Sequence, residues 1–220
     1  LVGLGDAHNS SEGNFGIIHT GPRGWSGPTY AQGWSFNVPT EEFYNSFDSQ
    51  DMRRDATVLD IVAFAAATGA SYTEGYEHTG YYNNKYIPRA GESGAQTELN
   101  YLTNYRAIRY ADVLLMAAEA YNRGGINDEI ARDYLNQVRM RAFEGEPEYL
   151  IEGLTGSALT EAIWEERKLE LSMEGHRFFD LVRTGQAPIK ITGFVEGKHE
   201  VFPIPQQEID ISGLTQNPGY

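Results

Sequence analysis

The stretch Asn104–Gly125, NYRAIRYADVLLMAAEAYNRGG, predicts an amphipathic helix and determines the architecture expected for the chain. Its apolar side chains recur with the 3.6-residue period of an α-helix, so one continuous stripe can be buried against a partner. The stripe consists of Ile108, Ala111, Leu115 and Ala118, widened by Leu114 and Tyr121. The two glycines at the end of the stretch form a natural C-terminal stop.

A second helix is expected directly after this glycine turn, in INDEIARDYLNQVRMRAF, Ile126–Phe143. Asn127 is the candidate N-cap, and two acidic residues follow in the first turn, where the helix dipole favours negative charge. One face carries Ile130, Tyr134, Leu135 and Val138. Two helices joined by a short turn lie antiparallel and bury their stripes together. We therefore expect a mainly α fold with tetratricopeptide-like helical hairpins, long irregular loops and minor β structure.

A third helix is expected from about Ser157 to Thr184, with an interruption near Gly175. Its carboxylates include Glu166, Glu170 and Glu174, which repeat every four residues and therefore face the same way. An acid/base pair for glycoside cleavage needs carboxyl groups on opposite sides of the scissile bond. The spacing favours the alternative, an ion-pair ladder that locks the helix against its neighbours.

Residues 1–103 form a loop-rich first part in which elements are short. Thr40–Phe47 is a candidate helix with Thr40 as N-cap, Ala56–Phe64 a β-rich run, and GYYNNKYIPR, Gly80–Arg89, a short strand. Residues 104–220 form the helical second part. We expect the two parts to make one domain of a larger protein.

The chain ends in a proline-stiffened segment, VFPIP, followed by QQEIDISGLTQNPGY. The prolines fix extended backbone at little entropic cost. We expect this tail to remain extended and to pack Val201, Phe202 and Ile204 along the late helices.

The composition excludes several classes of function. Among 220 residues, 31 are acidic and 17 basic, and the net charge of −14 disfavours nucleic acids and anionic lipids. The absence of cysteine excludes disulfides and thiol nucleophiles, and the five histidines lack metal-ligand spacing. No apolar run is long enough to span a bilayer, and no phosphate-binding glycine motif or Gly-x-Ser-x-Gly elbow is present.

Aromatic residues concentrate in Gly/Pro-rich loops of the first part, where no periodic stripe would bury them. Flat aromatic faces can stack on sugar rings, and amide or guanidinium groups beside them can bond the hydroxyls. The candidate glycan-binding residues are Trp25, Tyr30, Trp34, Arg23, Tyr81 and Tyr82, with Gln32, Asn83 and Asn84 as further polar partners. The alternative is that these rings pin the loops to the core.

Four motifs of the second part carry a family resemblance. They are YRAIRYADVLLMAAEAYN, LNQVRMRA, IWEERKLELSMEGHRFFDLVRTGQ and PIPQQEI with QNPGY. In order and spacing they resemble the C-terminal half of the SusD/RagB family of Bacteroidetes surface glycan-binding proteins, across about residues 104–220.

The resemblance implies a tetratricopeptide-containing lipoprotein of the outer membrane that captures oligosaccharides without catalysis and caps a SusC-type TonB-dependent transporter. The lipidated cysteine that would anchor such a protein is missing from this chain. No cofactor is expected. Some family members bind calcium, but no oxygen-rich ligand spacing here supports it.

Two other functions remain open on the sequence alone. One is a glycoside hydrolase, which would release reducing ends from glycans. The other is a helical interaction scaffold, which would bind a protein partner and be indifferent to sugars.

Overall fold

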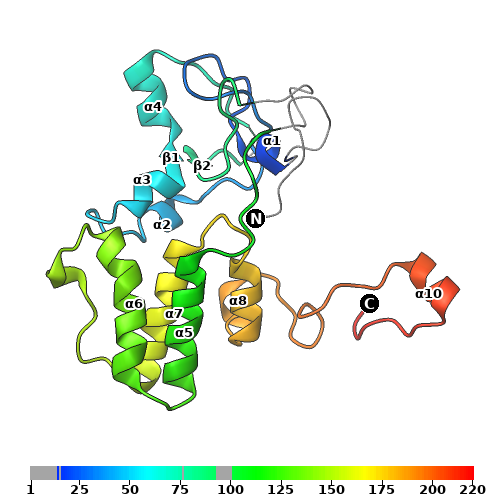
Figure 1. Ribbon diagram of the computed structural model, residues 1–220. Helices are drawn as coiled ribbons and strands as arrows, with labels where there is room; N and C mark the ends of the chain where they lie inside the picture. Colours follow the sequence, from blue (N-terminus) through cyan, green and yellow to red (C-terminus); the bar gives the residue numbers. More distant parts are fainter. Residues whose placement is uncertain (1–13, 15, 76, 93–100) are drawn as a thin grey trace. The chain divides into compact units, whose positions relative to one another are not determined.

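The computed structural model describes residue 14 and residues 16–75, 77–92 and 101–220 (Figure 1). The predicted loop-rich region, residues 1–103, includes residues 1–13, 15, 76 and 93–100, which lie outside the described residues. The described elements are α1 (Gly16–Thr20), α2 (Glu41–Tyr44), α3 (Arg53–Thr57), β1 (Val58–Asp60), α4 (Ile61–Thr68), β2 (Tyr81–Asn83), α5 (Tyr110–Arg123), α6 (Asp128–Ala142), the 3₁₀ turn η1 (Pro147–Tyr149), α7 (Gly156–Glu170), α8 (Arg177–Arg183), α9 (Ala187–Lys190) and α10 (Gln206–Ser212). The mainly α prediction is confirmed.

The chain divides into two compact units, Leu1–Glu174 and Gly175–Tyr220. Within the first unit, α5, α6 and α7 lie side by side as a helical bundle (Figure 1). None of the helices in the described part of the chain combines the length and apolar character needed to cross a bilayer.

The bundle core contains most of the predicted stripes. The buried side chains are Ala111, Leu114, Leu115, Ala118, Ala131, Leu135, Val138, Leu159 and Ile163. Two predicted members are wrong, Ile108 and Ile130. Ile108 is 70% exposed because α5 begins only at Tyr110, and Ile130 lies at the exposed edge of α6. The small alanines let the helices approach closely, so burial concentrates in the middle of each helix.

The helix ends follow the expected chemistry. The Asn127 side chain accepts hydrogen bonds from the backbone N–H groups of Glu129 and Ile130, as an N-cap does. Gly125 adopts the left-handed conformation at φ 63° in the turn between α5 and α6. The third predicted helix breaks where expected, because α7 ends at Glu170 and α8 begins at Arg177.

The predicted β-rich run Ala56–Phe64 is only partly correct. β1 pairs antiparallel with β2, with Leu59 opposite Tyr82, and this confirms the short second strand. The chain then turns into α4, because the Asp60 side chain accepts from the Ala63 N–H at 2.8 Å and the following alanines favour helix. Gly69 ends α4 at φ 70°.

The short helix after Pro39 is confirmed with its cap. The Thr40 hydroxyl accepts from the Phe43 N–H at 3.1 Å, and α2 ends at Tyr44, earlier than the expected Phe47.

The tail differs from the expected uninterrupted extended segment. Pro205 presets the entry to α10, and Gly213 ends that helix in the left-handed conformation. The Gln216 side-chain amide then accepts from the Ile204 N–H and donates to the Ile204 carbonyl, both at 2.8 Å. The segment therefore closes on itself as a loop. The expected packing of Val201 and Phe202 is wrong, because both side chains are exposed, even though the Phe202 ring lies 6.2 Å from that of Phe178 within the second unit.

Candidate functional site

Trp25 and Tyr30 do not present open ring faces, contrary to the sequence prediction. They are 9% and 6% exposed and pack with Phe64 of α4, with ring centroids 5.0–5.9 Å apart. Backbone bridges fold their loop inward, joining Ser26 to Ser71 and Tyr30 to Arg89. Burial raises the pKa of Tyr30, although Arg89 opposes this shift. These two rings hold the loop to the protein, which is the alternative that the sequence left open.

Tyr81 and Tyr82 point to opposite faces of β2, as neighbours in a strand must. Tyr82 is fully buried, its hydroxyl lies 3.0 Å from the Ser35 hydroxyl, and burial raises its pKa. Tyr81 is half-buried and stacks on Tyr44 with centroids 4.5 Å apart. The expected exposure is therefore wrong for Tyr82, and Tyr81 already has an aromatic partner.

The predicted polar partners Asn83 and Asn84 are occupied within the fold. The Asn83 side-chain oxygen accepts from the backbone N–H groups of Lys85 and Tyr86. The Asn84 side chain donates to the Asp55 carbonyl at 2.9 Å. Gln32 is exposed.

Trp34 and Arg23 line an open groove of about 320 Å³ in the first unit, which we call the Trp34 groove. Its described lining is Arg23, Trp34, Ser35, Phe36, Asn37, Val38, Gly75 and Glu77. Trp34 is half-buried, and Phe36 is 53% exposed. Two aromatic rings thus share a groove with a cation, a carboxylate and an amide.

Backbone hydrogen bonds fix the shape of the Trp34 groove. The Trp34 and Phe36 N–H groups donate to the carbonyls of Ile18 and His19, at 2.8 and 2.7 Å. The His19 ring meets Trp34 edge-on, with centroids 4.7 Å apart. The groove aromatics are therefore anchored from behind by α1.

Arg23 braces the same wall. Its Nη2 donates to the Trp34 carbonyl at 2.8 Å, and its backbone N–H donates to the Ser35 hydroxyl at 3.0 Å. Ser35 and Asn37 adopt left-handed backbone, with φ of 60° and 51°. Such conformations are costly for residues with a side chain and cluster at binding sites. Here they flank Phe36 and set the direction of its ring.

Phe36, Asn37 and Glu77 are groove residues that the sequence prediction did not include. The Trp-Ser-Phe spacing was visible as part of the aromatic loop, but nothing in the sequence distinguished it from Trp25 and Tyr30. The difference lies in tertiary contacts, because α4 covers the latter pair.

A second polar assembly, the Glu170 network, confirms the ion-pair ladder. It comprises Asp51, Arg53, Lys85, Arg109, Arg139, Arg141, Glu166, Glu170 and Glu174. The three glutamates are almost fully buried. Burial opposes ionisation of Glu170, but hydrogen bonds from Arg141 and Arg109 outweigh it, so the pKa of Glu170 lies below its ordinary value. The ladder is structural, because each carboxylate is held by cations from other segments.

The Glu170 network also joins the first and second parts of the sequence. Lys85, next to β2, donates to Glu174 at 2.6 Å and to the carbonyls of Glu170 and Ser172. Burial lowers the pKa of Lys85, although Glu174 opposes the shift. The described residues contain no group of three or more metal-ligating side chains arranged to hold an ion.

Comparisons with known proteins identify the family and the fold. A family model described as the SusD family matches residues 56–220. SusD-like protein P2 of Formosa agariphila is 34% identical over 213 residues, which are 91% of this chain and 40% of that protein.

Two solved structures share the fold. A laminarin-binding SusD-like protein is 40% identical with a TM-score of 0.80, over 96% of this chain and 45% of its own. Surface glycan-binding protein A from Bacteroides thetaiotaomicron, in complex with laminarihexaose, is 32% identical with a TM-score of 0.79, over 93% and 46%. The chain thus spans less than half the length of these relatives. Because the family model covers more than half of the chain, the chain belongs to the SusD family.

Proposed function

We propose that the protein captures oligosaccharides at the Trp34 groove without cleaving them. The observation that carries this proposal is the fold shared with a surface glycan-binding protein solved with laminarihexaose. The groove adds the chemistry, since Trp34 and Phe36 offer apolar faces to a sugar ring. A glucan of the laminarin type is the proposed ligand, and an uncharged glucan is compatible with a chain of net charge −14.

The groove supports binding better than hydrolysis. Glycoside cleavage uses two carboxyl groups on either side of the scissile bond. Glu77 is the one carboxylate among the described residues that line the groove. The buried glutamates of α7 are held by arginines and do not line it. A hydrolytic function therefore has no matching pair in the described part of the groove.

The cellular setting is also a proposal. Family membership supports a place on the outer-membrane surface, attached by a lipid anchor, with delivery of the glycan to a SusC-type TonB-dependent transporter. We propose no resident cofactor or calcium ion.

The test is titration calorimetry with laminarihexaose on the wild type and two tryptophan variants. Trp34→Ala should weaken binding by about 5- to 150-fold, because one stacking face contributes roughly 1–3 kcal/mol. Trp25→Ala is the matched control, and should lower the free energy of unfolding by about 3–5 kcal/mol while the folded fraction still binds.

Retention of affinity in Trp34→Ala would remove the groove as the binding site. Incubation with laminarin and an assay for new reducing ends separates capture from hydrolysis. Tight binding to a protein partner with no response to any glycan would favour the scaffold alternative.

A further inference from the structure

A second cavity of the first unit, of about 440 Å³, is lined by an excess of cations. It lies against α3 and the ends of the bundle helices, and shares no lining residue with the Trp34 groove. Its lining is Met52, Arg53, Ala56, Thr57, Lys85, Tyr86, Arg106, Arg109, Arg141, Glu170 and Glu174. Five cations therefore face two carboxylates in a chain whose net charge is −14. A basic cavity on an acidic protein concentrates anions.

The two carboxylates in this cavity have no free oxygen to offer. Glu170 accepts from Arg109 on one oxygen, and from Arg53 and Arg141 on the other. Both oxygens of Glu174 accept from Arg109, and one of them also accepts from Lys85. Both carboxylates of the cavity lining are therefore fully paired with cations of the protein.

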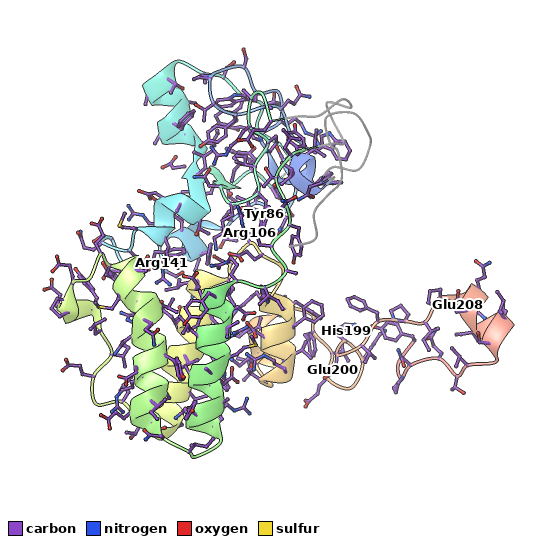
Figure 2. All side chains as sticks on the ribbon, in the orientation of Figure 1. Tyr86, Arg106, Arg141, His199, Glu200 and Glu208 are labelled. Carbon is purple, nitrogen blue, oxygen red and sulfur yellow. The ribbon has the colours of Figure 1, made fainter. Side chains whose placement is uncertain are left out.

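Two guanidinium groups keep unused donors. Arg106 makes no side-chain hydrogen bond or ion pair with any described residue, while its backbone N–H donates to the Tyr86 hydroxyl at 3.1 Å. Arg141 donates through Nη2 to Glu170, leaves its other nitrogens without a described partner, and its side chain is 57% exposed. Figure 2 shows Arg106 beside Tyr86, and Arg141 at the end of α6. Planar guanidinium groups with free N–H pairs match a carboxylate.

The rest of the lining is apolar or unsatisfied. Met52 is exposed, Ala56 lies one helical turn further along, and Tyr86 adds its ring. In the same wall the Thr57 hydroxyl is buried without a hydrogen-bond partner among the described residues. This hydroxyl is enclosed by protein atoms, so it adds no contact for a ligand in the cavity. A ligand that fits carries an anionic end and an apolar face.

We propose that this cavity binds the carboxylate of a small ring-bearing organic acid, such as a uronic acid unit of an acidic glycan. Arg106 pairs with the carboxylate, Arg141 contributes a second cation, and the ring lies against Met52, Ala56 and Tyr86. The proposal does not depend on glycan capture at the Trp34 groove.

The test is titration calorimetry at constant ionic strength with three probes, which are sodium D-glucuronate, sodium cyclohexanecarboxylate and D-glucose. Binding of glucuronate alone supports the site and assigns it to sugar acids. Binding of both carboxylates supports it and assigns it to ring acids in general. Binding of neither carboxylate, or equal binding of glucose, overturns the proposal.

Variants locate the site. Arg106→Gln should lower the affinity for the acid by at least about tenfold, because a charge-assisted contact to the carboxylate is lost. Arg106→Lys keeps the charge but loses the paired donors, so its affinity for the acid should lie between those of the wild type and Arg106→Gln. Arg123→Gln is the matched control, because Arg123 pairs with Glu119 and does not line the cavity.

An unchanged affinity in Arg106→Gln overturns the proposal, provided that thermal melting shows the variant is folded. Since the Arg106 side chain has no described partner, we expect no change in melting temperature. Laminarihexaose titration of the same variant separates the two proposals. Loss of glucuronate binding with laminarihexaose binding intact assigns two independent sites.

Discussion

Arg53 at the start of α3 donates a hydrogen bond to Glu166 in the middle of α7, a residue 113 positions further along the chain. Both side chains are buried, and Arg53 also bonds Asp51. Loss of one partner of a buried ion pair is strongly destabilising, because it leaves an uncompensated charge in the interior. This contact therefore couples the loop-rich part of the sequence to the helical bundle.

Removal of the Arg53 charge should destabilise the fold strongly. Arg53→Gln leaves the buried Asp51 without its described cation and takes one cation from Glu166 and from Glu170, so we expect the free energy of unfolding to fall by about 3–5 kcal/mol. Urea denaturation measures this change. Arg54→Gln is the control, because Arg54 pairs with the exposed Asp55 and should cost less than about 1 kcal/mol. Equal losses in the two variants would contradict a special role for the buried pair.

Stability should fall at acid pH through Glu170. The folded-state pKa of Glu170 lies below its ordinary value of 4.5. The contribution of Glu170 to the free energy of unfolding is therefore fully present above pH 4.5. Below it the unfolded chain takes up the proton first, and the contribution is lost as the pH falls through the folded-state pKa. Urea denaturation from pH 6 to pH 2 should show this loss. Glu170→Gln should flatten the profile there, and an unchanged profile would exclude Glu170 as its source.

Replacement of the unpaired Thr57 hydroxyl should not harm the fold. Thr57→Val keeps the shape and removes a buried polar atom without a described partner, so we expect a gain of up to about 1 kcal/mol in the free energy of unfolding. Thr160→Val is the control. The Thr160 hydroxyl bonds Asn122 and the Gly156 carbonyl, so its loss should cost about 1 kcal/mol. Similar losses in both variants would mean that the Thr57 hydroxyl is paired in solution.

The closed loop of the tail can be followed at one amide. Ile204 lies between Pro203 and Pro205, which have no N–H. The exchange of its amide hydrogen with solvent can therefore be measured without overlap from its sequence neighbours. Gln216→Ala removes both bonds to Ile204 and should speed its exchange by about tenfold. Hydrogen exchange followed by NMR makes this measurement. Gln206→Ala, which removes only an exposed contact to Asp210, should leave the Ile204 rate unchanged.

Patterns among neighbouring residues predicted where helices begin and end. They did not predict which side chains pair with the buried carboxylates. The caps at Thr40 and Asn127 and the turn at Gly125 depend on neighbours in the sequence, and each is present. The ladder of Glu166, Glu170 and Glu174 could be predicted from their spacing alone. Their cations Arg53 and Lys85 come from distant segments, and no periodic pattern could identify them.

The candidate site was predicted in kind but only partly in position. Trp25 and Trp34 lie in similar Gly/Pro-rich sequence, yet the first packs on α4 and the second lines a groove. Burial of a loop aromatic depends on which element folds over it, and this is a tertiary property. The sequence alone could therefore name the loop, but not the ring that faces outward.

The Glu170 network contributes no residue to the Trp34 groove. Under the proposed function, a substitution in the loop that carries Trp34 and Phe36 can therefore change which oligosaccharide is bound without disturbing the buried ion pairs.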